Sequence, residues 1–361
     1  MVARAQERSI GIRVALVALV TDTARTSPPS TSANDARSWA MFLSLAVIWG
    51  SSFMWITVAL EDGVPPMTIV AWRALAACVL LVAVLVYRRG RLPLRWNLWK
   101  RMFALGALNM VIPMALISWG QQFIPSGMAS ILNATVPLFT IVLAAALLAD
   151  EYITPAKISG LALGFAGVVV LASPNLTAAG ADEDAAAAVA GMAAVAAAGF
   201  FYALASVYVR RRITGMPIVE QPDGSTRAPL PVEIALGTTA SALLMITVLA
   251  VLFERPEGGL ITVPQTVGAW VGVVWLGALG TGVAYLIFYR LIARWGATRT
   301  TLVTYVIPLV AIVVGYIFLD ERLRPIELIG AALIIGGVIL VNANVGQKPL
   351  FDRRRAASDI D

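Results

Sequence analysis

Runs of about twenty apolar residues recur along almost the whole chain, and no other feature constrains its fold as strongly. A helix needs about 20 such residues to cross a hydrocarbon layer of about 30 Å. Backbone polar groups inside lipid must be satisfied within their own segment, so runs of this length predict helices rather than strands. The sequence therefore predicts an all-α polytopic membrane protein with ten transmembrane helices, at about 40–60, 67–87, 102–122, 127–148, 155–172, 188–208, 231–253, 267–289, 297–319 and 326–343.

Two halves of the chain resemble each other. The tetrapeptide LGAL occurs at 105–108 in the first half and again at 276–279 in the second. Further along each half, DEYITPAKISGLALGFAGVVV (150–170) aligns without a gap with DERLRPIELIGAALIIGGVIL (320–340). The shared landmarks of the longer segments are Asp-Glu, Pro and Gly rather than the abundant Leu and Ala. The sequence therefore predicts an internal repeat.

Each predicted repeat contains five spans. Because five is odd, the two repeats are expected to enter the membrane from opposite sides, as two inverted five-helix repeats. Secondary transporters use this architecture, so transport is the leading interpretation. The expected organisation is a cytoplasmic disordered or interface-lying tail 1–38, a first repeat 39–174, an extracytoplasmic linker 175–186, a second repeat 187–345 with a cytoplasmic loop 209–230, and a cytoplasmic tail 346–361.

The basic residues are distributed unevenly between the loops. With a cytoplasmic N-terminus, 23 of the 27 Lys and Arg residues fall on the cytoplasmic side. This bias follows the positive-inside rule and predicts that both termini and residues 88–101 are cytoplasmic. The net charge of +6 thus reflects topology in the cytoplasmic (inner) membrane and does not indicate a nucleic-acid partner. Residues 9–20 resemble a signal-peptide core, which leaves open whether residues 1–25 are cleaved or retained.

Several classes of site lack the residues they need. The chain has no histidine and one cysteine, Cys78, which removes the commonest general base and any intramolecular disulfide. Metal-ligand clusters, nucleophile motifs and phosphate-binding loops are also missing from the sequence. We therefore expect no cofactor and no metal. An intramembrane enzyme is disfavoured.

Polar side chains follow one face of three predicted spans. Polar residues in membrane helices tend to face other helices or a wet cavity. A proline also frees the carbonyl of the residue four positions earlier, here Asn133 or Thr304, near the middle of the bilayer. The alternative is that the hydroxyls only bond back to their own helix. The stripes are Ser130, Asn133, Pro137 and Thr140 in span 4, Thr301, Thr304 and Pro308 in span 9, and Thr281, Tyr285 and Tyr289 in span 8.

Two further residues are unusual at their depth. Trp49 lies near the middle of span 1, where its indole N–H needs a partner, and with Ser52 it is a candidate for the cavity lining. A bulky packing role for Trp49 is equally compatible with the sequence. Arg73 is a charge well inside span 2. It is interpreted as a gate or structural charge, with a clamp for a substrate carboxylate as the alternative.

Acidic pairs end two equivalent spans. Asp150 and Glu151 follow span 4, and Asp320 and Glu321 follow span 9. They are expected on opposite sides of the membrane, as gate or loop-fixing charges. No Asp or Glu lies deep in any predicted span, so the sequence does not support a buried carboxylate relay.

Several segments together carry a resemblance to a known family. They are LAVIWGSSFMWITVAL (45–60), WRALAACVLL (72–81), and the twin segments that start GMASILNATVPLF and GATRTTLVTYVIPLV and end in ADEYITP and LDERLRP. Over about 40–345, the chain resembles the EamA family of the drug/metabolite transporter superfamily. The resemblance implies a ten-helix basket with a central cavity lined mainly by spans 1, 3, 4, 6, 8 and 9.

The resemblance also implies a function. Family members are mostly exporters of amino acids, related metabolites or toxic compounds. We therefore expect a secondary transporter that exports a small-molecule substrate through the lipid bilayer by alternating access. A flippase of a lipid-linked intermediate is the alternative. The substrate, the driving force, the direction and a homodimeric state are left open by the sequence.

Overall fold

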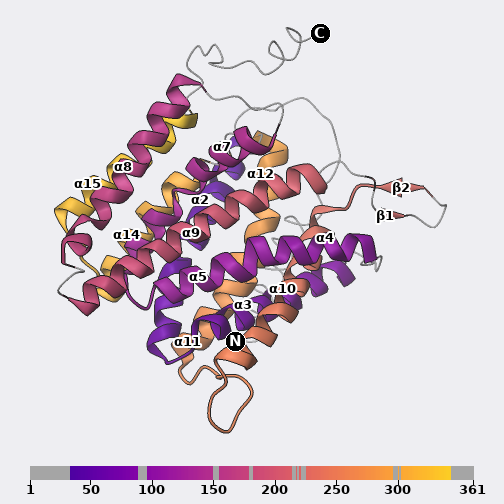
Figure 1. Cartoon of the computed structure of the whole chain (residues 1–361). Coiled ribbons are helices and arrows are strands. Elements are labelled where there is room, and N and C mark those ends of the chain that lie inside the picture. The colour runs from indigo at the N-terminus through magenta and orange to yellow at the C-terminus, as the bar shows by residue number, and fades with distance from the viewer. Residues whose placement is uncertain are drawn as a thin grey trace.

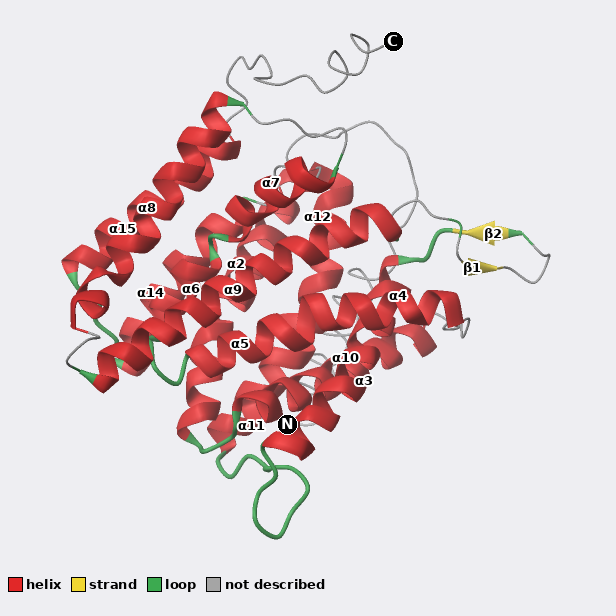
Figure 2. Cartoon of the chain, viewed as in Figure 1, coloured by secondary structure: helices red, strands yellow, loops and turns green. Residues whose placement is uncertain are grey.

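The computed structural model describes residues 33–87, 96–148, 154–178, 182–213, 217, 219–220, 225–295, 300 and 302–342. These residues form a bundle of helices with one short antiparallel ribbon at its side, β1 (Val219–Glu220) paired with β2 (Thr226–Arg227) (Figures 1 and 2). The helices are α2 (Ala33–Glu61), α3 (Pro66–Tyr87), α4 (Trp96–Gly106), η1 (Ala107–Val111), α5 (Ile112–Gly120), α6 (Ser126–Asn133), α7 (Val136–Leu147), α8 (Pro155–Ala178), α9 (Glu183–Arg212), α10 (Pro231–Phe253), α11 (Val267–Val274), η2 (Trp275–Val283), α12 (Ala284–Trp295), α14 (Val303–Leu319) and α15 (Pro325–Asn342).

The described residues of the ten apolar runs lie almost entirely on helices. In the described part of the chain, eight helical stretches are long and apolar enough to cross a membrane. The last two runs form shorter apolar helices, Val303–Leu319 and Pro325–Val341. The prediction of an all-α membrane protein is therefore confirmed.

Helix ends are set by local chemistry. Asp182 caps α9 by accepting a hydrogen bond from the Asp184 N–H at 3.0 Å. Two acidic residues stand in the first turn of α9 and three arginines in its last turn, which complements the helix dipole at both ends. Thr266 caps α11 through the Ala269 N–H at 3.2 Å. These signals fix where the membrane helices begin.

Both LGAL segments overlap π-helices: the second lies within η2, and the last two residues of the first begin η1. The π-helix η1 follows directly on α4, and η2 runs from Trp275 to Val283. Alignment of the two LGAL segments places η1 inside η2, so the two repeats share this feature. A π-helical turn carries one more residue than an α-helical turn and often occurs at functional sites.

The equivalent helices α8 and α15 pack side by side at one edge of the bundle (Figure 1). A Cβ atom on Gly160 would lie 2.6 Å from the Gly337 carbonyl oxygen, and one on Gly167 would lie 2.7 Å from the Gly330 carbonyl oxygen. The helices therefore run antiparallel, backbone against backbone. Because the repeat alignment pairs Gly160 with Gly330 and Gly167 with Gly337, exchange of the two repeats converts each of these contacts into the other.

Gly337→Ala is expected to lower the free energy of unfolding by about 1–3 kcal/mol, because its Cβ would lie 2.5 Å from backbone atoms of Gly160 and Gly164. Gly336→Ala is the matched control, since its Cβ would meet only a Leu163 methyl at 3.7 Å. The control should be neutral or gain a few tenths of a kcal/mol from the better helix propensity of Ala. Thermal unfolding of the purified protein measures both. Equal melting temperatures would contradict this account of the α8–α15 contact.

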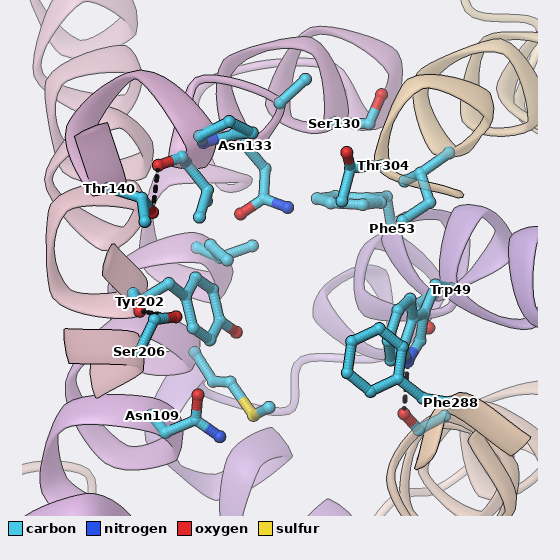
Figure 3. A pocket seen from close by; sticks show the side chains of 18 of the residues that line it. Trp49, Phe53, Asn109, Ser130, Asn133, Thr140, Tyr202, Ser206, Phe288 and Thr304 are labelled. Carbon is cyan, nitrogen blue, oxygen red and sulfur yellow. Dashed lines mark hydrogen bonds between the residues drawn. The ribbon is translucent and has the colours of Figure 1, made fainter. Parts of the chain in front are cut away.

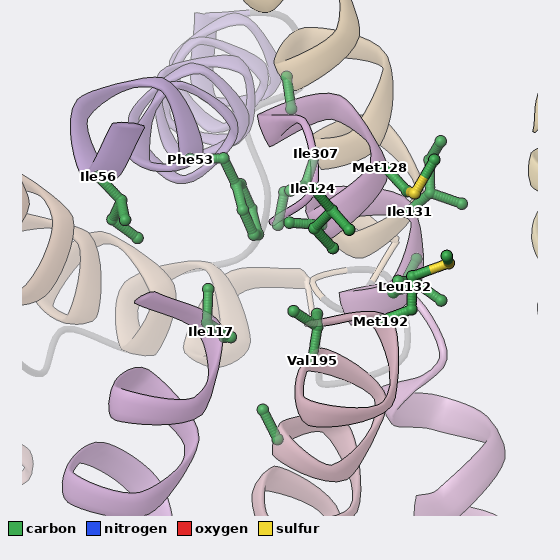
Figure 4. Packing of buried hydrophobic residues seen from close by; sticks show 14 of the residues in the cluster. Phe53, Ile56, Ile117, Ile124, Met128, Ile131, Leu132, Met192, Val195 and Ile307 are labelled. Carbon is green, nitrogen blue, oxygen red and sulfur yellow. The ribbon is translucent and has the colours of Figure 1, made fainter. Parts of the chain in front are cut away.

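The largest hydrophobic cluster of the described residues is centred where α2, α5, α6, α9 and α14 meet and extends to α8 and α15 (Figure 4). Ile131, Leu132 and Val195 are fully buried there, and Phe53 and Ile307 complete the side that faces the middle of the bundle. Close packing of these side chains fixes the positions of the helices relative to one another. This cluster supports one end of the cavity described next.

Candidate functional site

A cavity of about 530 Å³ lies in the middle of the bundle (Figure 3). Its wall combines aromatic and aliphatic side chains with polar groups from both halves of the chain. The polar residues that line it are Ser52, Arg73, Asn109, Ser130, Asn133, Thr140, Tyr202, Ser206, Tyr285, Thr304 and Tyr305. The larger apolar residues are Trp49, Phe53, Ile56, Met114, Ile117, Ile141, Phe288 and Ile307. Volume and composition are typical of a site for a small molecule.

A break in span 4 positions Asn133. Helix α6 ends at this residue, and α7 begins at Val136 with Pro137 in its first turn. Thr135 donates to the Leu132 carbonyl at 2.6 Å and so tightens the turn between the two helices. The Oδ1 atom of Asn133 is buried and has no hydrogen-bond partner among the described residues. Its amide points into the same part of the cavity as Thr304 (Figure 3).

Two long-range hydrogen bonds join the halves of the chain at the cavity wall. The Trp49 indole donates to the Gly280 carbonyl at 3.0 Å, which satisfies the N–H expected to need a partner at this depth. The Asn109 amide donates to the Tyr285 hydroxyl at 2.8 Å. Both bonds end on span 8, so the first repeat holds the second repeat's cavity residues in place.

Arg73 lies in the cavity wall, and its side chain does not extend toward the outer surface of the membrane. Its side chain is 8% exposed, and its Nε donates to the Thr281 hydroxyl at 3.0 Å. Thr281 is fully buried in η2 and in turn donates to the Leu276 carbonyl at 3.1 Å. Gly277 allows η2 to approach α3 closely, because a Cβ at this position would overlap the Arg73 carbonyl. The glycines of η2 therefore bring α3 close enough for the bond.

Most residues singled out in the sequence meet at this cavity. Trp49, Ser52, Asn133, Pro137, Tyr285, Thr304 and Arg73 all line it. Thr281 lies behind Arg73, and Pro308 is buried within α14, which continues through it without a break. Asp150 and Glu151 lie outside the described residues. Asp320 and Glu321 stand far along α14 from its cavity-lining residues, at the end of that helix.

Sequence reasoning missed several residues of the cavity. Asn109 was overlooked although it is an amide within an apolar span. Tyr202 and Ser206, four positions apart in span 6, form a short polar stripe of the kind used for spans 4, 8 and 9. Phe53 and Phe288 carry no sequence signal, because aromatic residues are common in apolar runs. The expected set of lining spans also omitted span 2, which contributes Arg73.

Glu321 ties the end of α14 to the start of α6. Its carboxylate accepts hydrogen bonds from the Ser126 N–H at 2.7 Å, the Ser126 hydroxyl at 2.8 Å and the Gly127 N–H at 3.0 Å. Asp320 instead caps α14 in a left-handed conformation and faces Arg322 at 3.5 Å on the exposed surface. The two acidic neighbours thus have different surroundings.

Two more carboxylates make similar links between helices. Asp62 accepts hydrogen bonds from the Gln265 N–H at 2.6 Å and from the next N–H, just before α11. The bond from Gln265 holds the pKa of Asp62 below its usual value, so this link persists above the ordinary pKa and is lost only as the pH falls through the lowered pKa. Glu254 accepts from the N–H groups of Met67 and Thr68 at the start of α3, both at 2.8 Å.

Glu321→Gln is expected to lower the free energy of unfolding by about 1–3 kcal/mol, because an amide replaces the charged acceptor of three hydrogen bonds. Asp320→Asn is the control, since an exposed ion pair contributes little and Asn tolerates the left-handed conformation. Thermal unfolding at neutral pH compares the two variants. A Glu321→Gln melting temperature equal to that of the control would show that the link adds no stability.

Comparison with known proteins identifies the family. The model of the EamA-like transporter family matches residues 37–173 and, a second time, 189–343. The chain belongs to the EamA-like transporter family. The resemblance inferred from the sequence is thereby confirmed, and the two matches fall on the two predicted repeats.

Relatives of this EamA-like chain include named transporters. The probable terminal-alkyne amino-acid exporter of Streptantibioticus cattleyicolor is 30% identical over 89% of this chain and 96% of its own. The uncharacterized inner membrane transporter YedA of Escherichia coli is 27% identical over 82% of this chain and 88% of its own. A crystal structure with 20% identity covers 84% of this chain with a TM-score of 0.55, which shows the fold alone. The chain is therefore a multi-pass membrane transporter of the EamA type.

Proposed function

We propose that this EamA-like protein is a secondary transporter that exports small metabolites, namely amino acids or related compounds or drugs, across the cytoplasmic membrane. In this proposal ten helices form two inverted five-helix repeats around the cavity, which opens alternately to either side. The observation that carries the proposal is the central cavity, whose polar groups come from both repeats. A site shared by two equivalent halves is what alternating access requires.

The glycine contacts between α8 and α15 support the inverted arrangement. Each helix presents equivalent glycines to the other, and the contacts of Gly160 with Gly337 and of Gly167 with Gly330 exchange when the two repeats are exchanged. Equivalent helices that run antiparallel are what an in-plane pseudo-two-fold axis produces. The π-helices at equivalent positions of spans 3 and 8 support the same relationship.

The polar links between helix ends support an inward-facing conformation. In the predicted topology Asp62, Glu254 and Glu321 all lie on the outer side, where they tie helix ends together. At the opposite end of the cavity, Ser206 lines the wall and is exposed, one turn before the arginines that end α9. A site closed outside and accessible inside is the loading state of an exporter.

Uptake into proteoliposomes tests the function. Labelling of exposed positions measures which fraction of the protein is inside-out and which is right-side-out. Radiolabelled amino acids and cationic drugs are then screened for uptake with and without a proton gradient. We expect saturable uptake of at least one solute above protein-free liposomes. The name of the Streptantibioticus cattleyicolor relative favours amino acids with an apolar side chain as the first solutes to test. No uptake of any solute under either condition would contradict the proposal.

Cysteine labelling tests the orientation. In a Cys78→Ala background, Glu257→Cys in the loop between α10 and α11 should react with an impermeant maleimide added to intact cells. Thr226→Cys in β2 should react only after the membrane is opened, because the basic segment around it is predicted to be cytoplasmic. Both positions are exposed, so access is limited by the membrane alone. The reverse pattern would overturn the orientation and the direction of transport inferred from it.

A further inference from the structure

Arg73 is the sole charged side chain among the described residues that line the cavity. Its side chain is 8% exposed, so most of the hydration of the guanidinium is lost. Burial of a cation costs several kcal/mol unless an anion or hydrogen-bond acceptors compensate for it. The described lining contains neither Asp nor Glu, and the compensation has to come from elsewhere.

The protein compensates this cation incompletely. Nε bonds to the Thr281 hydroxyl at 3.0 Å, and the Thr281 proton is directed to the Leu276 carbonyl, so the hydroxyl lone pair faces Arg73. Within the described residues no carboxylate lies within 4 Å of the guanidinium, and its two terminal nitrogens have no hydrogen-bond partner. The side chain is therefore oriented through Nε while its outer edge is left for a ligand.

The space in front of this edge is kept open. Gly280 stands opposite, and a Cβ there would lie 3.7 Å from the Arg73 Nη2 atom and 3.2 Å from the Ser52 hydroxyl. Tyr202 points into the cavity from α9, while Trp49 and Phe288 form an aromatic wall on the other side (Figure 3). A guanidinium edge fits a carboxylate through two parallel hydrogen bonds, and the aromatic wall fits an apolar remainder.

We propose that Arg73 binds the carboxylate of the transported molecule and so makes the cavity select carboxylic acids and zwitterions over organic cations. One guanidinium balances the single charge of a carboxylate, whereas a dianionic phosphate ester would leave a net buried charge. Asn133 lines the same cavity, and its Oδ1, which has no hydrogen-bond partner among the described residues, is an acceptor for a donor group, such as an ammonium, on the same molecule. The proposal rests on the transporter function only for the statement that the bound molecule is carried across the membrane.

The selectivity is tested by binding to the purified full-length protein, with four probes that share one skeleton: 3-phenylpropionate, L-phenylalanine, phenethylamine and 3-phenylpropan-1-ol. A ligand of the folded state raises the melting temperature according to its concentration and Kd. We expect both carboxylates to raise it, and the amine and the alcohol to bind at least tenfold more weakly. Equal shifts with phenethylamine and 3-phenylpropionate, or no shift with either carboxylate, would overturn the proposal.

Variants assign the effect to Arg73. In Arg73→Gln, the carboxylates should no longer raise the melting temperature, and the preference for the acid over the alcohol should be lost. Arg73→Lys should keep part of the temperature increase and part of the preference. Arg255→Gln, in the exposed loop after α10, is the control and should behave as wild type. If Arg73→Gln fails to fold, Thr281→Val keeps the charge, removes the partner of Nε and should weaken carboxylate binding severalfold without affecting the alcohol. Unchanged carboxylate binding in a folded Arg73→Gln or in Thr281→Val would contradict the assignment.

Different results of the binding and transport assays would contradict the anion site and the transporter function. Wild-type protein that binds carboxylates through Arg73 but moves no solute across liposomes would overturn the transporter function and leave the anion site. Wild-type protein that transports phenethylamine as fast as 3-phenylpropionate would leave the transporter function and overturn the anion site.

Discussion

Asn133→Leu is expected to reduce transport by roughly 10- to 100-fold while the protein unfolds at the same or a higher temperature. The reduction corresponds to about 1–3 kcal/mol, the value of a hydrogen bond that a buried acceptor makes with its ligand. Stability should not fall, because the Oδ1 atom of Asn133 has no partner within the described residues and removal of such an atom relieves a desolvation penalty. Proteoliposome uptake and thermal unfolding of the same preparation measure the two effects.

Asn97→Leu controls for the chemistry of the substitution. This residue is exposed at the start of α4, away from the cavity, so transport should remain at the wild-type rate. Wild-type transport by Asn133→Leu would exclude the Asn133 amide from the substrate site. A loss of stability in that variant would instead show that the amide is a structural group.

Thr304→Trp is expected to abolish transport without unfolding the protein. Thr304 lines the cavity beside Phe53, and a bulky indole at this position would occupy the space that Asn133 also faces (Figure 3). A cavity of about 530 Å³ has room for the added ring at some packing cost, and the ring would take the part of the cavity that both Thr304 and Asn133 line, so that substrate could no longer bind there. Uptake should fall to the level of protein-free liposomes.

The matched control lies on the same helix. Val313→Trp places the same side chain on the outer face of α14, where Val313 is 54% exposed, and should leave transport near the wild-type rate. The same tenfold or greater loss in both variants would point to a general defect of α14. Wild-type uptake by a folded Thr304→Trp would show that substrate passes elsewhere.

The helices and the repeat were predictable because the bilayer leaves few alternatives. Lipid requires each span to be apolar and helical, so the ten runs could be read directly from the sequence. Asn133 and Thr304 stood out for the same reason, since polar groups in such runs are costly unless they face other protein groups or water. These inferences depend on the solvent around the chain rather than on details of packing.

Features that depend on contacts between distant segments were not predictable. The bond between Arg73 and Thr281 joins residues 208 positions apart, and it forms only because Gly277 lets η2 approach α3. The π-helices η1 and η2 have no periodic sequence signal either. Asn109 and Tyr202 became recognisable as lining residues only once their helices were placed around a common cavity.

The two prolines illustrate how equivalent sequence can differ in structure. Pro137 follows a break between α6 and α7, whereas Pro308 lies inside the continuous helix α14. In span 4 the Thr135 hydroxyl donates a hydrogen bond to the Leu132 carbonyl and stabilises a turn. The equivalent position in span 9 is Val306, which has no hydroxyl that could compete with backbone N–H groups for a helix carbonyl. The side chain two residues before the proline is therefore one physical difference between the two segments.

The glycine contacts between α8 and α15 also bear on how such a chain could have arisen. Gly160 and Gly167 are the equivalents of Gly330 and Gly337, so one five-helix unit already carries both surfaces of the contact. Two identical copies of that unit, inserted antiparallel, would make it twice about a two-fold axis, as in an isologous dimer. Gene duplication and fusion would then preserve a pre-existing interface rather than invent one. After fusion, the cavity-lining residues of the two halves could diverge, whereas each of these glycines would still be required by the close approach of the opposite backbone.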